Sequence, residues 1–205
     1  MIKLNSPYDE FKFVGLTGQS RCGKDTLGSA LFMNDGYTMF SFAYAMKMAA
    51  VQIFDLDEEQ VNGDKKEVFD EFWQMTPRTI LQKFGTEAMR GVFGENIWVK
   101  ILAKQIEMFW EDFDEESDIV ITDVRFDNEA EFIRDNGGVV IRIIRDEGNK
   151  LSQDEKAHAS EAGVKDELVD FIIHNNDTKL AMYQQAEHFL QVVHSRKFNH
   201  ANTSI

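Results

Sequence analysis

GQSRCGKDT, the sequence of residues 18–26, lies between a short apolar run at residues 11–17 and a segment of helical character at residues 23–34. The pattern G-x-x-x-x-G-K between a strand and a helix is typical of a phosphate-binding loop, because its glycines let the backbone bend tightly and aim N–H groups at an anion. The N-terminus of the helix adds partial positive charge, and Lys24 would reach the β- and γ-phosphates of a triphosphate. A glycine-rich loop with an incidental lysine is the alternative, and the strand-loop-helix context argues against it.

The residue after the loop lysine departs from the usual motif. Asp25 stands where Ser or Thr usually binds Mg²⁺, and Thr26 follows one place later. Three roles fit Asp25: a direct magnesium ligand, a ligand through water, or a residue that orients a phosphate acceptor. We predict a role in magnesium binding or in catalysis.

Strand and helix patterns alternate along most of the chain. Strands are predicted at residues 11–17, 37–41, 118–123, 139–145 and 171–174, and helices at 23–34, 42–54, 77–89, 96–113, 127–136 and 178–194. This order predicts an α/β fold of three layers, with a mostly parallel central sheet and helices on both faces. Ligands of such sheets bind beyond the carboxyl ends of the strands. We therefore expect the residues that follow positions 17, 41, 123 and 145 to converge on one crevice.

The domain organisation predicted from the sequence is a single domain at residues 1–195. An acidic insert at residues 55–75 has no recognisable motif and is expected to form an exposed helix pair or a mobile flap. Residues 146–160 are polar and are predicted to form a lid over the phosphates. Residues 196–205 are predicted to be a disordered polar tail.

The composition allows one well-packed domain and argues against several partners. The chain has 205 residues, of which 43% are hydrophobic, enough for one core. A net charge of −14 repels nucleic-acid phosphates, so we expect no nucleic acid polymer as a partner. No apolar run approaches the roughly 20 residues that span a membrane, and residues 1–10 lack the pattern of a signal peptide. With a single cysteine, Cys22, no intramolecular disulfide can form, and these features together predict a cytoplasmic protein.

A carboxylate and an arginine lie at the end of the strand predicted at residues 118–123. Asp123 ends this strand, where a P-loop enzyme commonly keeps a magnesium-linked or base carboxylate. Arg125 and Glu129 come next, and both would face the crevice if a helix begins near residue 127. The alternative is a salt-bridged turn at the surface.

A second candidate set lies on the helix predicted at residues 77–89. Arg78 and Gln82 are four residues apart and share a face, which Thr86 continues one turn later. Gly85 would let a ligand approach closely, and a guanidinium can hold a monophosphate with two hydrogen bonds. A solvated helix face is the alternative. Three further candidates are Lys47 for a phosphate, Trp98 for a base, and Arg145 for adenine or phosphate.

Five segments, in the same order, resemble phage-type deoxynucleoside monophosphate kinases, which are relatives of the adenylate and guanylate kinases. They are GxxxxGKDT at residues 18–26, RTILQKFGTE at 78–87, IWVK at 97–100, DVRFDNE at 123–129 and HASEAG at 158–163. The Lys-Asp-Thr ending of the loop and the pieces FGTE and DxRxxxE distinguish this family from other P-loop proteins. The resemblance covers nearly the whole chain.

The resemblance implies a P-loop nucleotide kinase that transfers a phosphoryl group from ATP, with Mg²⁺, to a deoxynucleoside monophosphate. The residues predicted to bind ATP are Gly18, Arg21, Gly23, Lys24, Asp25, Thr26 and Arg145, with Asp25 as the metal ligand. The residues predicted to bind the acceptor are Lys47, Arg78, Gln82, Gly85, Thr86, Trp98, Asp123, Arg125 and Glu129. The residues predicted to be catalytic are Lys24, Asp25, Asp123 and Arg125.

Two other functions stay open at this point: a P-loop kinase of another metabolite, such as dephospho-coenzyme A, and an ATP-binding module without catalysis. The preferred base and the choice between deoxyribose and ribose also stay open. Kinases of this kind are monomers or homodimers, and the sequence favours neither state. Asp25 and Asp123 are both candidates for the carboxylate closer to magnesium.

Overall fold

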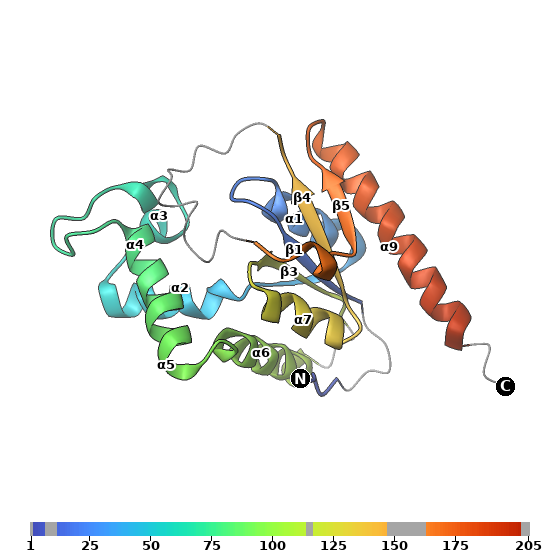
Figure 1. The fold of residues 1–205 in the computed structure, drawn as a ribbon, viewed down its shortest axis with the longest axis horizontal. Coiled ribbons are helices and arrows are strands. Elements are labelled where there is room, and N and C mark those ends of the chain that lie inside the picture. Colours follow the sequence, from blue (N-terminus) through green and yellow to red (C-terminus); the bar gives the residue numbers. More distant parts are fainter. Residues whose placement is uncertain (1, 7–11, 114–116, 147–162, 202–205) are drawn as a thin grey trace.

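The computed structural model describes residues 2–6, 12–113, 117–146 and 163–201. One sheet of five parallel strands, in the order β2-β3-β1-β4-β5, forms the centre of the molecule (Figure 1). The strands are β1 Phe13–Thr17, β2 Thr38–Phe40, β3 Ile119–Val124, β4 Val139–Ile144 and β5 Phe171–His174. The predicted α/β class with a parallel sheet is confirmed.

Helices cover both faces of this sheet. The long elements are α1 Lys24–Asp35, α6 Ile97–Phe113, α7 Asp127–Asp135 and α9 Lys179–Ala201, and η4 Asp166–Leu168 is a short 3-10 turn before β5. Helices α1 and α9 pack on one face, and α6 and α7 lie on the other (Figure 1). These are the three layers that the sequence predicts.

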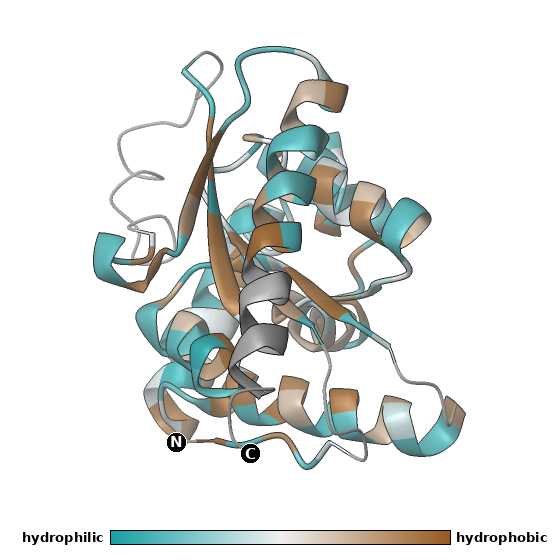
Figure 2. Cartoon of the chain, turned by 90° about the vertical axis from the view of Figure 1, so that its right-hand side faces the viewer, coloured by the Kyte–Doolittle hydropathy of each residue, from teal (hydrophilic) through white to brown (hydrophobic). Residues whose placement is uncertain are grey.

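The two faces of the sheet are buried in different hydrophobic clusters, because successive residues of a strand point to opposite sides. In β1, Phe13 joins the cluster under α6 and α7, whereas Val14 and Leu16 join the cluster under α1 and α9. Figure 2 shows the strands mostly in the hydrophobic colour, whereas the helices carry both colours. Strands buried on both faces read as continuous apolar runs, which is why the sequence located them well.

The register between β1 and β3 shifts at the edge of the sheet where the strands end. Gly15 pairs with Ile121, but Thr17 pairs with Val124, so β3 holds one extra residue. Because such a bulge re-aims side chains, Ile121 and Val124 both face the α6–α7 cluster although three positions separate them. The bulge therefore lies beside Asp123, the last polar residue of the strand.

A helical lobe stands beyond the carboxyl ends of the strands (Figure 1). Its elements are α2 Ala43–Phe54, α3 Glu58–Val61, η1 Asp64–Glu67, α4 Pro77–Gln82, η2 Lys83–Arg90 and α5 Gly91–Phe93. A separate apolar cluster holds the lobe together, with Leu56 and Val61 of the insert packed against Ile80 and Leu81. Within residues 55–75 the structure contains the two short helices α3 and η1. Leu56 and Val61 are buried, whereas Val68, Phe69 and Phe72 are exposed.

Three expectations from the sequence need comment. The helix predicted at residues 77–89 is α-helical only to Gln82 and continues as the π-helical element η2. Helix α9 continues to Ala201 and so includes the first part of the polar tail predicted at residues 196–205. Most of the predicted lid, residues 147–160, lies outside the described residues. No helix in the described ranges is long and apolar enough to cross a membrane.

Candidate functional site

The loop between β1 and α1 bends around the ammonium group of Lys24. Lys24 Nζ donates hydrogen bonds of 2.8 Å to the carbonyl oxygens of Gly18 and Gln19. Gly18 and Gly23 have φ of +135° and +113°, a backbone conformation that residues with a Cβ rarely adopt. A Cβ on Gly18 would also lie 2.3 Å from the carbonyl oxygen of Ile143. The two glycines thus shape the loop that the sequence predicts to bind phosphate.

A cavity of about 360 Å³ opens in front of this loop. Gly18, Gln19, Ser20 and Lys24 line one side, and Arg142 and Arg145 come from β4 and the residue that follows it. Of the residues predicted to bind ATP, the lining therefore includes Gly18, Lys24 and Arg145. Arg21, Gly23, Asp25 and Thr26 belong to the loop and the first turn of α1 but do not line the cavity.

Asp25 is exposed in the first turn of α1, directly after the loop lysine. Its carboxylate makes no hydrogen bond or ion pair with a described residue. Mg²⁺ at a nucleotide site is held by one or two carboxylates together with phosphate oxygens and waters, so it requires no preformed cage. Among the described residues no three His, Cys, Asp or Glu side chains gather as a metal cluster. A free carboxylate beside the phosphate loop fits this kind of site.

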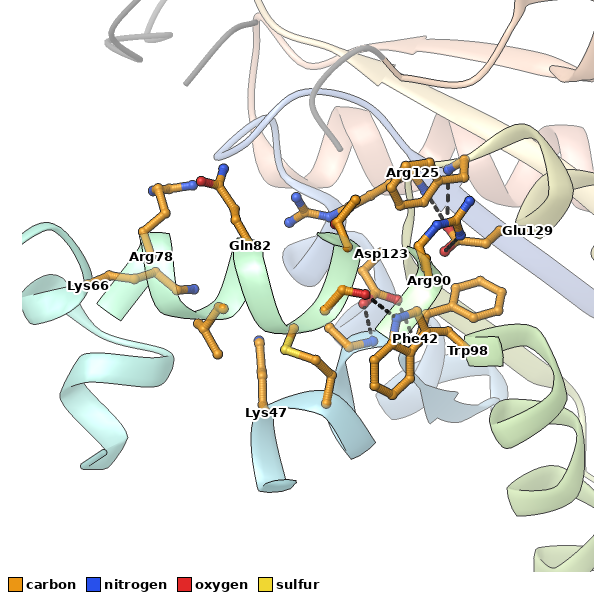
Figure 3. Close-up of a pocket in the computed structure, with 16 residues that line it drawn as sticks. Phe42, Lys47, Lys66, Arg78, Gln82, Arg90, Trp98, Asp123, Arg125 and Glu129 are labelled. Atoms are coloured by element: carbon orange, nitrogen blue, oxygen red, sulfur yellow. Dashed lines mark hydrogen bonds and ion pairs between the residues drawn. The ribbon is translucent and has the colours of Figure 1, made fainter. Parts of the chain in front are cut away.

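A second pocket, of about 110 Å³, lies between the sheet edge and the helical lobe. Figure 3 shows Lys66, Arg78 and Gln82 on one side of it, and Arg90, Trp98 and Glu129 on the other. The lining includes every residue predicted to bind the acceptor: Lys47, Arg78, Gln82, Gly85, Thr86, Trp98, Asp123, Arg125 and Glu129. The segments at residues 78–86, 98 and 123–129, which are far apart in the sequence, thus line one pocket, as predicted.

Asp123 connects the end of β3 to the start of α2. Its carboxylate accepts hydrogen bonds from Ser41 Oγ at 2.8 Å and from the backbone N–H groups of Phe42 at 2.8 Å and Ala43 at 2.9 Å. A carboxylate has about four lone-pair sites, so these bonds occupy most of them. Between Asp25 and Asp123, the geometry leaves Asp25 the more available for a metal ion.

Glu129 is buried beneath the pocket, with 2% of its surface exposed. Its Oε2 accepts hydrogen bonds from the backbone N–H groups of Arg125 at 2.7 Å and Phe126 at 3.1 Å. Burial raises the pKa of this carboxyl to about 7, and the nearby Asp123 carboxylate adds to the rise, while the backbone N–H groups and Arg90 oppose it. Glu129 therefore shapes the turn that carries Arg125.

The sequence reasoning missed Arg90, which lines the pocket beside Glu129. Its guanidinium lies 3.8 Å from the centroid of the Phe126 ring, and its Nη1 is 4.0 Å from Glu129 Oε1. On an ideal α-helix, Arg90 would lie about 120° around the axis from Arg78. The π-helical turns of η2 hold more residues and return Arg90 to the pocket face. Only the unusual helix type places it there, and the amino-acid pattern contains no signal of that type.

Among the described residues, two buried nitrogen atoms in this pocket have no hydrogen-bond partner: Gln82 Nε2 and Arg90 Nη1. Buried donors are normally paired, and an unpaired one at a pocket wall points to a group that a ligand would supply. Trp98 is different, because its Nε1 donates to the carbonyl oxygen of Gly85 at 2.9 Å and its ring is fixed at the wall. The pocket is also lined by six residues for which the sequence predicts no part in binding: Phe42, Ala43, Met46, Lys66, Leu81 and Phe126.

The model of the deoxynucleotide monophosphate kinase family matches residues 49–186 of this chain. A candidate deoxynucleotide monophosphate kinase of Acanthamoeba polyphaga mimivirus is 32% identical over an alignment of 182 residues that covers 84% of this chain and 92% of that protein. The deoxynucleoside-5'-monophosphate kinase of Escherichia phage T5 is 31% identical over an alignment of 140 residues that covers 62% of this chain and 52% of that protein. The stretch that matches the family model includes every residue that lines the second pocket except Phe42, Ala43, Met46 and Lys47.

Among solved structures, TT1252 from Thermus thermophilus superimposes with a TM-score of 0.53 at 15% sequence identity, covering 90% of this chain and 98% of that chain. At this identity the likeness concerns the fold alone. It agrees with the parallel sheet and flanking helices described above.

Proposed function

The chain belongs to the deoxynucleotide monophosphate kinase family, and from this membership we propose that its two pockets bind the two substrates of a phosphoryl transfer. The cavity at the loop of residues 18–26 takes the donor nucleotide, ATP. The pocket under the helical lobe takes a deoxynucleoside 5'-monophosphate. An oxygen of the acceptor phosphate attacks the γ-phosphorus, the bond to the β,γ-bridging oxygen breaks, and ADP and the deoxynucleoside diphosphate leave.

The observation that carries this proposal is the position of Arg125, which lines both pockets. A phosphoryl group that passes between two bound nucleotides must cross the place where their sites adjoin. An arginine at that place can neutralise the charge on the transferred group, and phosphoryl transfer depends mainly on positioning and such neutralisation. The backbone of Arg125 is held by Glu129, which fixes its place between the sites.

The other residues divide into binding and positioning roles. Lys24 binds the β- and γ-phosphates, Arg78 and Arg90 bind the acceptor phosphate, and Gln82 hydrogen-bonds the base or the sugar. Asp123 is a positioning residue, because its carboxylate holds the first turn of α2 against β3. The apolar wall of Phe42, Met46, Leu81 and Trp98 suits the face of a base.

We assign the magnesium-binding role to Asp25 rather than Asp123, on the free carboxylate described above. Bound there with the phosphate oxygens, Mg²⁺ would supply charge neutralisation for the transferred group. The chain's own part is to present Asp25 beside Lys24 on the first turn of α1. Thr26, one residue later, would steady the phosphates on that turn.

A panel of acceptors tests the proposed function. Wild-type protein with Mg²⁺ and ATP should convert at least one of the four deoxynucleoside monophosphates to its diphosphate, as followed by ADP release. Lys24→Ala should lower this turnover roughly 10²- to 10³-fold, because it removes a charge aimed at the transferred group. Lys104→Ala, an exposed lysine of α6, is the matched control and should keep full activity.

The competing functions give different results in the same panel. A kinase of another metabolite would leave all four nucleotides unchanged and phosphorylate an acceptor such as dephospho-coenzyme A. An ATP-binding module would bind ATP without releasing ADP with any acceptor. Either result would refute the proposed function.

A further inference from the structure

The insert of residues 55–75 reaches the acceptor pocket through a single side chain. All residues of this segment are described, and Lys66 of η1 alone among them lines the pocket. The insert is held in place on both sides of this lysine. Val61 is buried before it, and Trp73 Nε1 donates to the carbonyl oxygen of Phe54 at 3.0 Å after it. Contacts on both sides of Lys66 therefore fix its place in the lobe.

The charges around Lys66 are mostly positive. Lys47 of α2, Arg78 of α4 and Arg125 after β3 all repel its ammonium group, and Glu67 is the carboxylate that attracts it. Glu67, however, is paired with the Arg78 guanidinium. Among the described residues, Lys66 itself has no hydrogen-bond or ion-pair partner.

This arrangement is costly for the folded protein, because a partly buried ammonium group loses water without gaining a counter-ion. Burial lowers the pKa of Lys66 to about 8, and the repulsion from Lys47, Arg78 and Arg125 adds to the effect. The whole chain carries a net charge of −14, so this is a local gathering of positive charge on an acidic protein. A bound anion would supply the missing counter-charge.

We propose that Lys66 binds the phosphate group of the acceptor nucleotide, so that the acidic insert forms part of the acceptor site. The proposal rests on the function proposed above and adds to it a residue that lies outside the site predicted from the sequence. The ion pair between Glu67 and Arg78 joins η1 to α4, and Lys66 and Arg78 line the same pocket. Both side chains can therefore contact one bound phosphate. Lys66 and Arg78 then approach the phosphate from two different elements of the lobe.

Two neighbouring lysines make a matched pair for the test. Lys66→Met removes the ammonium and keeps the length of the side chain. Lys65→Met is the control, because Lys65 is exposed, pairs with Asp57 at 3.3 Å and does not line the pocket. With the best acceptor of the panel, Lys66→Met should raise the KM for the acceptor roughly 10- to 100-fold, the loss expected for one charge-assisted contact. The KM for ATP should stay within about threefold, and Lys65→Met should behave as the wild type.

The pH dependence gives a second readout that a merely structural residue would not alter. The second pKa of a phosphate monoester is about 6, so the acceptor is a dianion throughout the range from pH 7 to 9.5. In the wild type, kcat/KM for the acceptor should fall as pH rises through about 8, because Lys66 loses its proton. Lys66→Arg keeps its charge over this range and should show no such fall. Identical profiles for the two proteins would overturn the proposal.

Calorimetric titration with each of the four deoxynucleoside monophosphates separates this inference from the proposed function, because it does not require turnover. Weaker binding to Lys66→Met than to the wild type and Lys65→Met supports the role of Lys66 even if no acceptor is phosphorylated. Equal affinities of all three proteins overturn it even if the enzyme is active. Thermal unfolding without ligand completes the test: Lys66→Met should unfold at the same or a higher temperature than the wild type, and a lower temperature would indicate a structural role instead.

Discussion

At the scale of single residues, the pocket proposed to bind the acceptor combines one buried carboxyl group with several positively charged side chains. Glu129 exposes only 2% of its surface, and burial raises its pKa to about 7 from the usual 4.5. Between these two values the folded protein keeps a proton that the unfolded chain has released. Folding stability therefore falls as pH rises through this range, by the contribution of this one group.

Glu129→Gln should remove this pH dependence. The amide oxygen can still accept the hydrogen bonds from the Arg125 and Phe126 N–H groups, but the side chain no longer titrates. Between pH 5 and pH 8 the unfolding midpoint in urea should fall more steeply for the wild type than for Glu129→Gln. Glu131→Gln, an exposed change on the same helix, should follow the wild type. Parallel curves for wild type and Glu129→Gln would show that Glu129 does not titrate in this window.

Not every residue of the pocket could be inferred from the sequence. Arg78, Gln82 and Arg125 lie in recognisable segments, so their place in the pocket was predicted. Lys66 lies in a charged insert without a motif, and a lysine among many charged residues gives no sign that it will face inward. Its place in the pocket depends on how η1 lies against α4, and the ion pair between Glu67 and Arg78 joins these two elements.

At the scale of elements, α1 approaches the sheet closely because Gly28 faces β3. A Cβ on Gly28 would lie 2.5 Å from Thr122 Cγ2. Thr122 is β-branched and belongs to a central strand, so it has little freedom to move away. Because Gly28 has no side chain, α1, which contains Lys24 and Asp25, can lie this close to the sheet.

Gly28→Ala should therefore destabilise the protein although alanine is the better helix former. Alanine favours the helix by about 1 kcal/mol, and the overlap with Thr122 costs about 1 to 3 kcal/mol. The net effect should be a lower melting temperature, since about 1 kcal/mol corresponds to roughly 2 to 4 °C in a chain of this size. Ser29→Ala, at an exposed position of the same helix, should raise the melting temperature slightly. A higher melting temperature for Gly28→Ala would mean that the helix moves away at little cost.

The helix that begins at Pro77 shows how far a local pattern reaches. Thr76 and Pro77 predict its start, and in the structure the Thr76 side chain accepts a hydrogen bond from the Thr79 N–H. The change to a π-helix at Lys83 has no such signal. The fixed Trp98 ring and its hydrogen bond to the Gly85 carbonyl lie at this place, so contacts with α6 accompany the change.

At the scale of the whole molecule, the net charge of −14 opposes both folding and the approach of anionic nucleotides. Mutual repulsion between acidic side chains at the surface destabilises the compact state. Salt weakens this repulsion, since the Debye length falls from about 30 Å at 0.01 M to about 10 Å at 0.1 M. The melting temperature should therefore rise as NaCl increases over this range. NaCl and KCl should act alike, and a flat or falling melting temperature would show that self-repulsion is not significant in this fold.

Local patterns were enough to establish the phosphate loop, the alternation of strands and helices and the family resemblance, because each depends on a few neighbouring residues and a short-range period. Strand order, the bulge at the end of β3, the π-helical turns and the inward face of the insert arise from contacts between segments distant along the chain. Those contacts bring Arg90 and Lys66 into a pocket with Arg78, Asp123 and Arg125. The free energy of such packing depends on two contacting segments together, so it cannot be inferred from either segment alone.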